Sequence, residues 1–218
     1  MKLTRVAGRR DLRDFLALSE KIYGRDPRHV PVPRQQIRRW FRGGVPGVRL
    51  YVMRNDRGET VARTTLHADP ALDAKLGRPL QLFGLTEFAD CDGVAEALFD
   101  AICAAGRASG KAAAFGPVAL LPNQSGGVIT SGFDDPGFIG SAWNHDYYPA
   151  AYEKYGFEAR FEADTWICPV AGAGTGDPGE IFGFDDARFA AEDLELHRGD
   201  RRHGAGRAGP RVHAPAVP

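Results

Sequence analysis

Three features are scarce in this sequence, and each scarcity excludes a class of protein. The three cysteines are odd in number and widely spaced, with no Cys-x-x-Cys pair, which argues against a disulfide framework and a metal site. The 28 basic and 28 acidic residues cancel, so no net field would attract nucleic acid. No apolar run is long enough for a signal peptide or a membrane span. We therefore expect a cytoplasmic protein without metal, nucleic acid or membrane partners.

The apolar content is sufficient for one folded core. Hydrophobic residues make up 43% of the chain and aromatic residues 10%. After residue 170 the composition changes, because 171–179 is rich in Gly and Ala and 203–218 contains almost nothing that could be buried. The sequence thus predicts one domain over residues 1–170, followed by a linker and a largely disordered tail over 171–218.

Hydrophobic periodicity predicts an alternation of strands and helices. A β-hairpin is predicted over 48–67. The apolar run Leu80–Phe88 indicates a central strand that is buried on both faces of the sheet, and Asp92 is expected to cap the helix after this strand. The expected elements are a strand at 2–6, helices after Asp11 and Pro33, a hairpin over 48–67, a strand at 80–88, a helix from Asp92 to Ser109, a strand at 111–118 parallel to 80–88, a loop over 123–140, a helix at 146–155, and closing strands at 157–163 and 165–168.

The segment 151–157, Ala-Tyr-Glu-Lys-Tyr-Gly-Phe, resembles a pattern of the GCN5-related N-acetyltransferase superfamily. In that pattern a helix ends at a glycine and the following Phe begins a strand packed beneath it. Together with the element order, the resemblance implies an α/β (α+β) fold of the acyl-CoA N-acyltransferase type, with a mixed central sheet flanked by helices.

A more specific likeness runs from Gly116-Pro117 through Asn123, Asn144 and Tyr147-Tyr148-Pro149 to Gly156-Phe157. These residues resemble uncharacterised bacterial two-domain acetyltransferase-like proteins. The resemblance implies that the chain is truncated after the first domain and that the tail is a remnant of the second. Apolar surface left by a missing second domain would favour self-association.

The resemblance implies transfer of an acetyl or acyl group from acyl-coenzyme A (acyl-CoA) to a small-molecule amine. By position, Tyr152 would be the general acid, because a phenol with an ordinary pKa of about 10 is protonated at neutral pH. Glu87, near the end of the central strand, would be the base. Each residue also has a structural alternative, since Tyr152 could simply pack its ring and Glu87 could be an ordinary salt-bridged glutamate.

The expected coenzyme loop departs from the superfamily pattern. The resemblance implies that Gly93 and Asn144 contact the coenzyme and that Asn123 contacts the substrate. However, the stretch 89–95 contains one glycine and two carboxylates where glycine-rich backbone would approach the phosphates, and like charges disfavour binding. A second hypothesis therefore stays open, in which a non-catalytic binding or scaffolding domain of the same fold has lost coenzyme binding.

Overall fold

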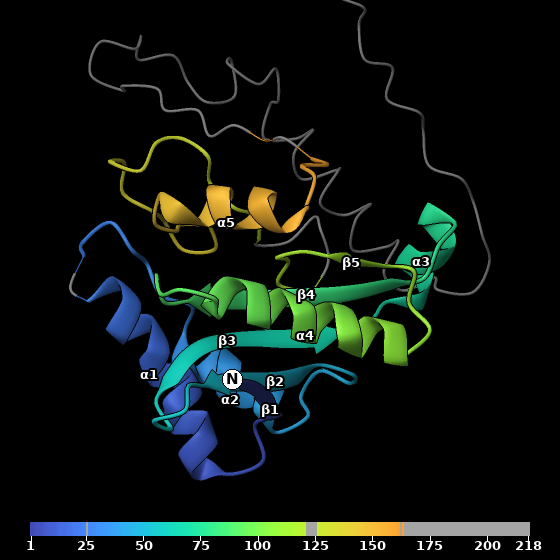
Figure 1. Ribbon diagram of the computed structural model, residues 1–218, viewed down its shortest axis with the longest axis horizontal. Helices are drawn as coiled ribbons and strands as arrows, with labels where there is room; N and C mark the ends of the chain where they lie inside the picture. The colour runs from blue at the N-terminus through green and yellow to red at the C-terminus, as the bar shows by residue number, and fades with distance from the viewer. Residues whose placement is uncertain (25, 121–125, 162, 164–218) are drawn as a thin grey trace, which may run out of the picture. The chain divides into compact units, whose positions relative to one another are not determined.

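A five-stranded mixed sheet runs through the computed structural model in the order β1-β2-β3-β4-β5 (Figure 1). The structure describes residues 1–24, 26–120, 126–161 and 163, which lie almost wholly in a unit spanning Met1–Phe161. The predicted boundary at residue 170 and the tail lie outside the described residues. The strands are β1 (Lys2–Arg5), β2 (Arg49–Arg54), β3 (Thr60–His67), β4 (Leu80–Phe88) and β5 (Ala113–Phe115).

Strand pairing confirms the predicted fold class. The first four strands are antiparallel neighbours, and β5 then pairs in parallel with β4 over Leu80–Leu82. The hairpin β2–β3 turns at Asn55, whose side chain accepts hydrogen bonds from the backbone of Arg57 and Glu59. The parallel pair is joined through a helix, as its direction requires.

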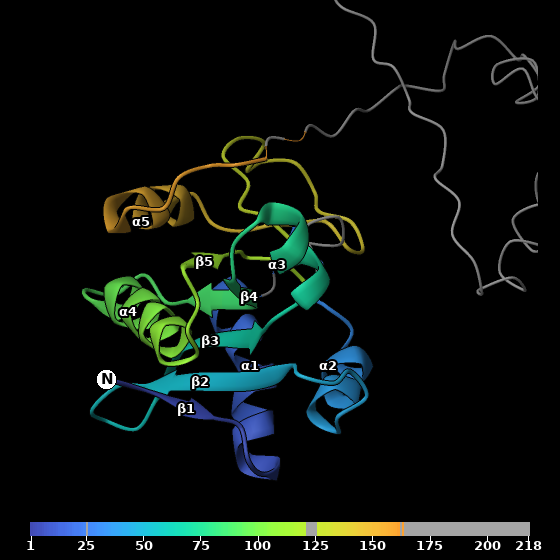
Figure 2. The same ribbon diagram turned by 90° about the vertical axis from the view of Figure 1, so that its right-hand side faces the viewer.

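Helices cover both faces of the sheet (Figure 2). Helices α1 and α2 pack on one face, which we call the α1 face, and α4 and α5 pack on the other, the α4 face. Neighbouring residues of β2 separate the two cores, because Val52 is buried with α1 and α2 and Met53 is buried with α4. The helices are α1 (Arg9–Tyr23), α2 (Arg34–Phe41), α3 (Pro70–Leu76), α4 (Val94–Ala108) and α5 (Tyr147–Tyr155).

A β-bulge in β4 changes which face its side chains meet. Between the pairs Arg63 with Glu87 and Thr65 with Gly84, one residue of β3 lies opposite two of β4, and Leu85 has a φ of 44°. Strict alternation would put residues 83 and 88 on opposite faces. The rings of Phe83 and Phe88 instead both enter the α4 core, so the bulge shifts the later part of β4 by one position.

Two predicted helix starts are wrong. Helix α1 begins at Arg9, so Asp11 lies in its first turn, where it accepts a hydrogen bond from the Ala7 amide. Helix α4 begins at Val94, and its cap position holds Gly93 at a φ of 72° with no side-chain cap bond. A tight turn in which the Val94 amide bonds Cys91 O takes the place of a cap by Asp92.

The polar stretch after β3 contains a short helix that the periodicity does not indicate. Asp69 caps α3 by accepting a hydrogen bond from the Leu72 amide at 2.7 Å, and Pro70 occupies the first turn. None of its residues is buried, so no apolar stripe marks the helix in the sequence. The local cap, rather than packing, accounts for it.

The closing strand predicted at 157–163 is not formed by residues 157–161. Phe157 packs against Phe83 and Phe99, but residues 158–161 are exposed. A strand needs one buried face to set its register, and these residues have none. The strand predicted at 165–168 lies outside the described residues.

Candidate functional site

Glu87 lies on the α1 face of β4, in a buried ion pair. One carboxylate oxygen, Oε1, accepts a hydrogen bond from Arg63 Nη2 at 2.6 Å and one from Ser19 Oγ at 3.1 Å. The side chain of Glu87 is 12% exposed. Its other oxygen, Oε2, is buried and has no hydrogen-bond partner among the described residues. The carboxylate is therefore held at one oxygen while the other keeps its acceptor capacity.

Arg63 fixes this carboxylate from the neighbouring strand. Its side chain is 3% exposed, its Nη1 donates to Phe15 O at 2.7 Å, and its guanidinium carbon lies 4.9 Å from the centre of the Phe15 ring. A buried arginine with these contacts has little freedom to move. The salt-bridged glutamate that the sequence left as an alternative is thus observed, and its salt bridge leaves Oε2 unoccupied.

Tyr152 lies on the opposite face of the sheet, in an aromatic cluster. Its ring centre is 4.6 Å from that of Phe99 and 5.2 Å from that of Phe157. The hydroxyl oxygen is buried without a hydrogen-bond partner among the described residues. Burial raises the pKa of Tyr152, with a smaller contribution from Tyr23, so its proton is retained at neutral pH.

The structure therefore does not bring the two predicted catalytic side chains together on one face. Two tyrosine hydroxyls connect helices on the two faces. Tyr23 Oη on α1 donates a hydrogen bond to Tyr148 Oη on α5 at 3.4 Å. Burial raises the pKa of both phenols, and the charge of Glu87 raises them further. The link between the faces is thus made by neutral tyrosines.

The first turn of α5 closes the edge of β4 beyond its pairing with β5. Tyr148 Oη accepts a hydrogen bond from the Phe88 amide at 3.1 Å, and Tyr147 Oη donates to Phe88 O at 2.7 Å. Both backbone groups of this edge residue are therefore satisfied by side chains rather than by a strand. The Tyr147-Tyr148 doublet was visible in the sequence, but nothing in its local pattern indicated this contact.

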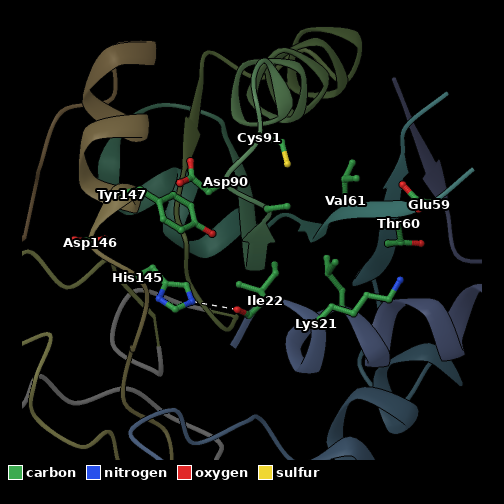
Figure 3. A pocket seen from close by; sticks show the side chains of 12 residues that line it. Lys21, Ile22, Glu59, Thr60, Val61, Asp90, Cys91, His145, Asp146 and Tyr147 are labelled. Carbon is green, nitrogen blue, oxygen red and sulfur yellow. Dashed lines mark hydrogen bonds between the residues drawn. The ribbon is translucent and has the colours of Figure 1, made fainter. Parts of the chain in front are cut away.

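A pocket of about 520 Å³ opens at the end of β4 on the α1 side (Figure 3). Neither Glu87 nor Tyr152 lines it, although Ala89, two residues beyond Glu87 on the chain, does. Its lining contains three carboxylates against one lysine. The lining residues come from α1, the start of β3, the β4–α4 loop and the start of α5: Leu18, Lys21, Ile22, Glu59, Thr60, Val61, Ala89, Asp90, Cys91, His145, Asp146 and Tyr147.

An aromatic group borders this pocket. Figure 3 shows His145 beside Tyr147, with His145 Nε2 at 3.2 Å from Ile22 O. The ring of His145 lies 5.1 Å from that of Tyr23, which in turn stacks on His29 at 3.9 Å. Burial lowers the pKa of His29, and the charge of Glu87 opposes this shift. Two of the residues that line the pocket, His145 and Tyr147, thus belong to a group of rings that carry polar atoms and that includes Tyr23 and His29.

Arg28 ties the long loop of residues 126–146 to the end of α1. Its guanidinium donates to Asp26 Oδ2 at 2.7 Å, to Phe133 O at 3.0 Å and to Asp134 Oδ1 at 3.1 Å. It also lies 5.5 Å from the centre of the Trp143 ring. The described part of the loop predicted over 123–140 is thereby anchored to Arg28 through Phe133 and Asp134.

The remaining predicted site residues have different positions. Asn144 is buried, and its amide bonds the Ile129 backbone on both sides and His145 O, so all its described bonds lie within the loop. Gly93 precedes the first turn of α4. Asn123 lies outside the described residues. The assigned roles of these three residues stay predictions.

Two other expectations from the sequence concern metal ions and membranes. Among the described residues, no three His, Cys, Asp or Glu side chains are placed to hold a metal ion. Within the same residues, no helix has the length and apolarity needed to cross a membrane.

The sheet order and the helices on both faces define a mixed α/β domain. Among solved structures, the chain is similar to two acetyltransferases. An acetyltransferase of Trypanosoma brucei is 15% identical, with a TM-score of 0.44 over 77% of this chain and 99% of that one. A ribosomal-protein-alanine N-acetyltransferase of Brucella melitensis biovar Abortus is 12% identical, with a TM-score of 0.48 over 77% of this chain and 100% of that one. These likenesses concern the fold alone.

Among curated proteins, the chain is similar to Protein YghO of Escherichia coli K12. The two are 26% identical over 160 residues, which cover 72% of this chain and 41% of YghO. The chain thus spans about two fifths of the length of this relative. No model of a known protein family matches the chain.

Proposed function

We propose that this chain is an N-acyltransferase-like protein that transfers an acyl group from an acyl thioester such as acyl-CoA to a small-molecule amine. One observation carries the proposal. Glu87 and Tyr152, the two residues expected to move protons, each have a buried polar atom without a partner among the described residues. An unpaired buried polar group costs about 1–3 kcal/mol, so its retention favours a bound partner.

Glu87 accepts the amine proton in this proposal. Arg63 and Ser19 hold Oε1, and Oε2 is the oxygen left to receive the proton. The pocket beside this strand favours a cationic amine, because Glu59, Asp90 and Asp146 outnumber Lys21 there. An amine arrives protonated at neutral pH, so a base is required before it can act as a nucleophile.

Tyr152 holds the second proton. The thioester supplies the acyl group and a thiolate that leaves without a proton. Tyr152 Oη is protonated at neutral pH and has no other acceptor among the described residues, which suits donation to that sulfur. Because Tyr152 is enclosed by rings, the donor would have to displace part of the α5 cluster to reach it.

The residues present fit the two ends of acyl-CoA unequally. The thioester end fits, because Tyr152 offers an unused donor. The phosphate end does not fit, because Asp90 and Asp92 adjoin the start of α4 where backbone amides would bind phosphate. No step is therefore assigned to the nucleotide.

A second candidate function is a non-catalytic binding or scaffolding domain of the same fold. The closed edge of β4 favours it, because Tyr147 and Tyr148 already satisfy both backbone groups of Phe88. An extended ligand with amide groups would have to break these bonds before it could pair with β4. In this alternative the amine pocket binds a ligand without any transfer.

Calorimetric titration with acetyl-CoA and with S-acetylpantetheine separates the two candidates. Binding of either thioester in the micromolar range would contradict the non-catalytic alternative. Absence of binding by both at millimolar concentration would contradict the acyltransferase.

Thiol release with a panel of amines then tests the two side chains. Tyr152→Phe should lower turnover about 10- to 1,000-fold and leave thioester binding nearly unchanged, because only a proton donor is lost. Glu87→Gln should lower the rate less at high pH, where the solvent deprotonates more of the amine. Tyr155→Phe, on the same helix, is the matched control; an equal loss in that variant would refute the role of Tyr152.

A further inference from the structure

The start of α4 lies in an acidic region of the surface. Asp90 lines the pocket, Asp92 precedes the cap residue Gly93, and Glu96 is in the first turn of the helix. Glu59 and Asp146 line the same pocket as Asp90. Three carboxylates thus lie in the loop and first turn of α4, where a helix would otherwise attract an anion, and two more share the adjoining pocket.

Few positive charges offset these carboxylates. Lys154 Nζ is bound to Glu96 Oε1 at 2.7 Å, and its pKa is raised by that pair. Lys21 on α1 lines the pocket. The two lysines leave an excess of three carboxylates in the group, which opposes a diphosphate in particular because each phosphate adds charge.

Backbone groups at this end of β4 are also partly occupied. The Phe88 amide and carbonyl are bonded to Tyr148 and Tyr147. By contrast, Tyr152 Oη has no partner among the described residues. The donor group available to a thioester is therefore at Tyr152 on α5, which does not line the pocket that contains Asp90.

We propose that the acidic β4–α4 loop selects against the diphosphate of coenzyme A, so that phosphate groups on an acyl thioester donor do not contribute to its recognition. This inference rests on the proposed acyl transfer and specifies its donor. The affinity for acyl thioesters then does not rise when phosphate groups are added to the arm.

The experiment compares S-acetylpantetheine, S-acetyl-4′-phosphopantetheine and acetyl-CoA by calorimetry on the full chain. In the unsubstituted protein we expect the affinity to stay level or fall along this series. In the double variant Asp90→Asn, Asp92→Asn, acetyl-CoA should bind about tenfold more tightly, whereas S-acetylpantetheine should change less than twofold, because two repulsive charges are removed near the phosphates only. Added salt should strengthen acetyl-CoA binding to the unsubstituted protein, since it screens repulsion.

Asp135→Asn with Glu158→Gln is the matched control, because it removes two exposed carboxylates that do not line the pocket. It should leave all three affinities unchanged. If acetyl-CoA binds the unsubstituted protein tenfold more tightly than S-acetylpantetheine, the donor inference is wrong and acyl transfer still stands. If none of the three binds either protein, the proposed acyl transfer itself fails, and the inference fails with it.

Discussion

The two faces of β4 bury opposite kinds of chemistry. On the α1 face, Arg63 and Glu87 form a charged pair supported by Ser19. On the α4 face, Phe88 and Tyr152 belong to a core of rings, where the Tyr152 hydroxyl has no hydrogen-bond partner within the described part of the chain. A charge can be buried only when it is paired, whereas rings are stabilised by burial itself.

The contrast teaches that the two faces of one sheet can hold the candidate base and the candidate acid in separate environments. On the α4 face, burial raises the pKa of the Tyr152 phenol, so it keeps the proton that its proposed role requires. Tyr23 on α1 and Tyr148 on α5 are joined by a hydrogen bond between their hydroxyls.

The largest expected effect comes from breaking the charged side. Arg63→Met leaves Glu87 buried without its partner, and we expect a loss of about 3–5 kcal/mol in the free energy of unfolding. Urea denaturation measures this loss. The double variant with Glu87→Gln should recover most of it, and Arg49→Met, on the exposed side of β2, should change stability by less than about 0.5 kcal/mol. Full stability of Arg63→Met alone would show that the pair is not needed.

The contact between the faces should have the next largest effect. Tyr148→Phe removes the acceptor for the Phe88 amide, and we expect a loss of about 1–2 kcal/mol. Tyr155→Phe loses only an exposed bond to Asp100 and is the matched control. Thermal and urea unfolding measure the stability of both variants. Equal losses would mean that the hydrogen bond between the Phe88 amide and Tyr148 contributes no more stability than the exposed bond of Tyr155.

On the α4 face, Tyr152→Phe should change the free energy of unfolding in the opposite direction. The hydroxyl has no partner among the described residues, so removing it should leave the free energy of unfolding unchanged or raise it by about 1 kcal/mol. Stability and turnover would then move in different directions. A clear loss of stability would instead indicate a hydrogen bond made by this hydroxyl in the folded protein.

The smallest expected effect concerns the hydrogen bonds between Arg28 and Asp26. Hydrogen bonds from the Arg28 side chain and amide lower the pKa of Asp26 from 3.8 to about 2. A lowered carboxyl pKa stabilises the fold above the unfolded value of about 3.8, and this contribution disappears as the pH falls toward 2. Asp26→Asn should therefore be less stable than the unsubstituted protein at pH 5 and equally stable near pH 2. Urea denaturation at each pH measures the difference in the free energy of unfolding. A difference that stays constant between pH 5 and pH 2 would contradict this role of the Arg28–Asp26 hydrogen bonds.

Local patterns were sufficient for most elements of the fold. Alternation in β2 and β3 and the apolar run of β4 each carried a signal within a few residues, and the structure confirms these strands. Both mispredicted helix starts depended on cap geometry, because α1 follows Gly8 in extended backbone and α4 follows Gly93 in a left-handed conformation. The exposed helix α3 lacked any periodic signal to read, whereas the strand predicted over 157–163 is not formed by residues 157–161, of which 158–161 are exposed.

The sequence by itself supplied the two candidate side chains, because Glu87 lies near the end of an apolar strand and Tyr152 lies in a helix that stops at a glycine. Only the tertiary structure decided where they lie. The bulge at Leu85 shifts β4 by one position, so that Glu87 meets Arg63 on the α1 face while Phe88 enters the rings of the α4 face. A bulge depends on the register between two strands, and partners that are far apart in the chain leave no local pattern from which that register could be read.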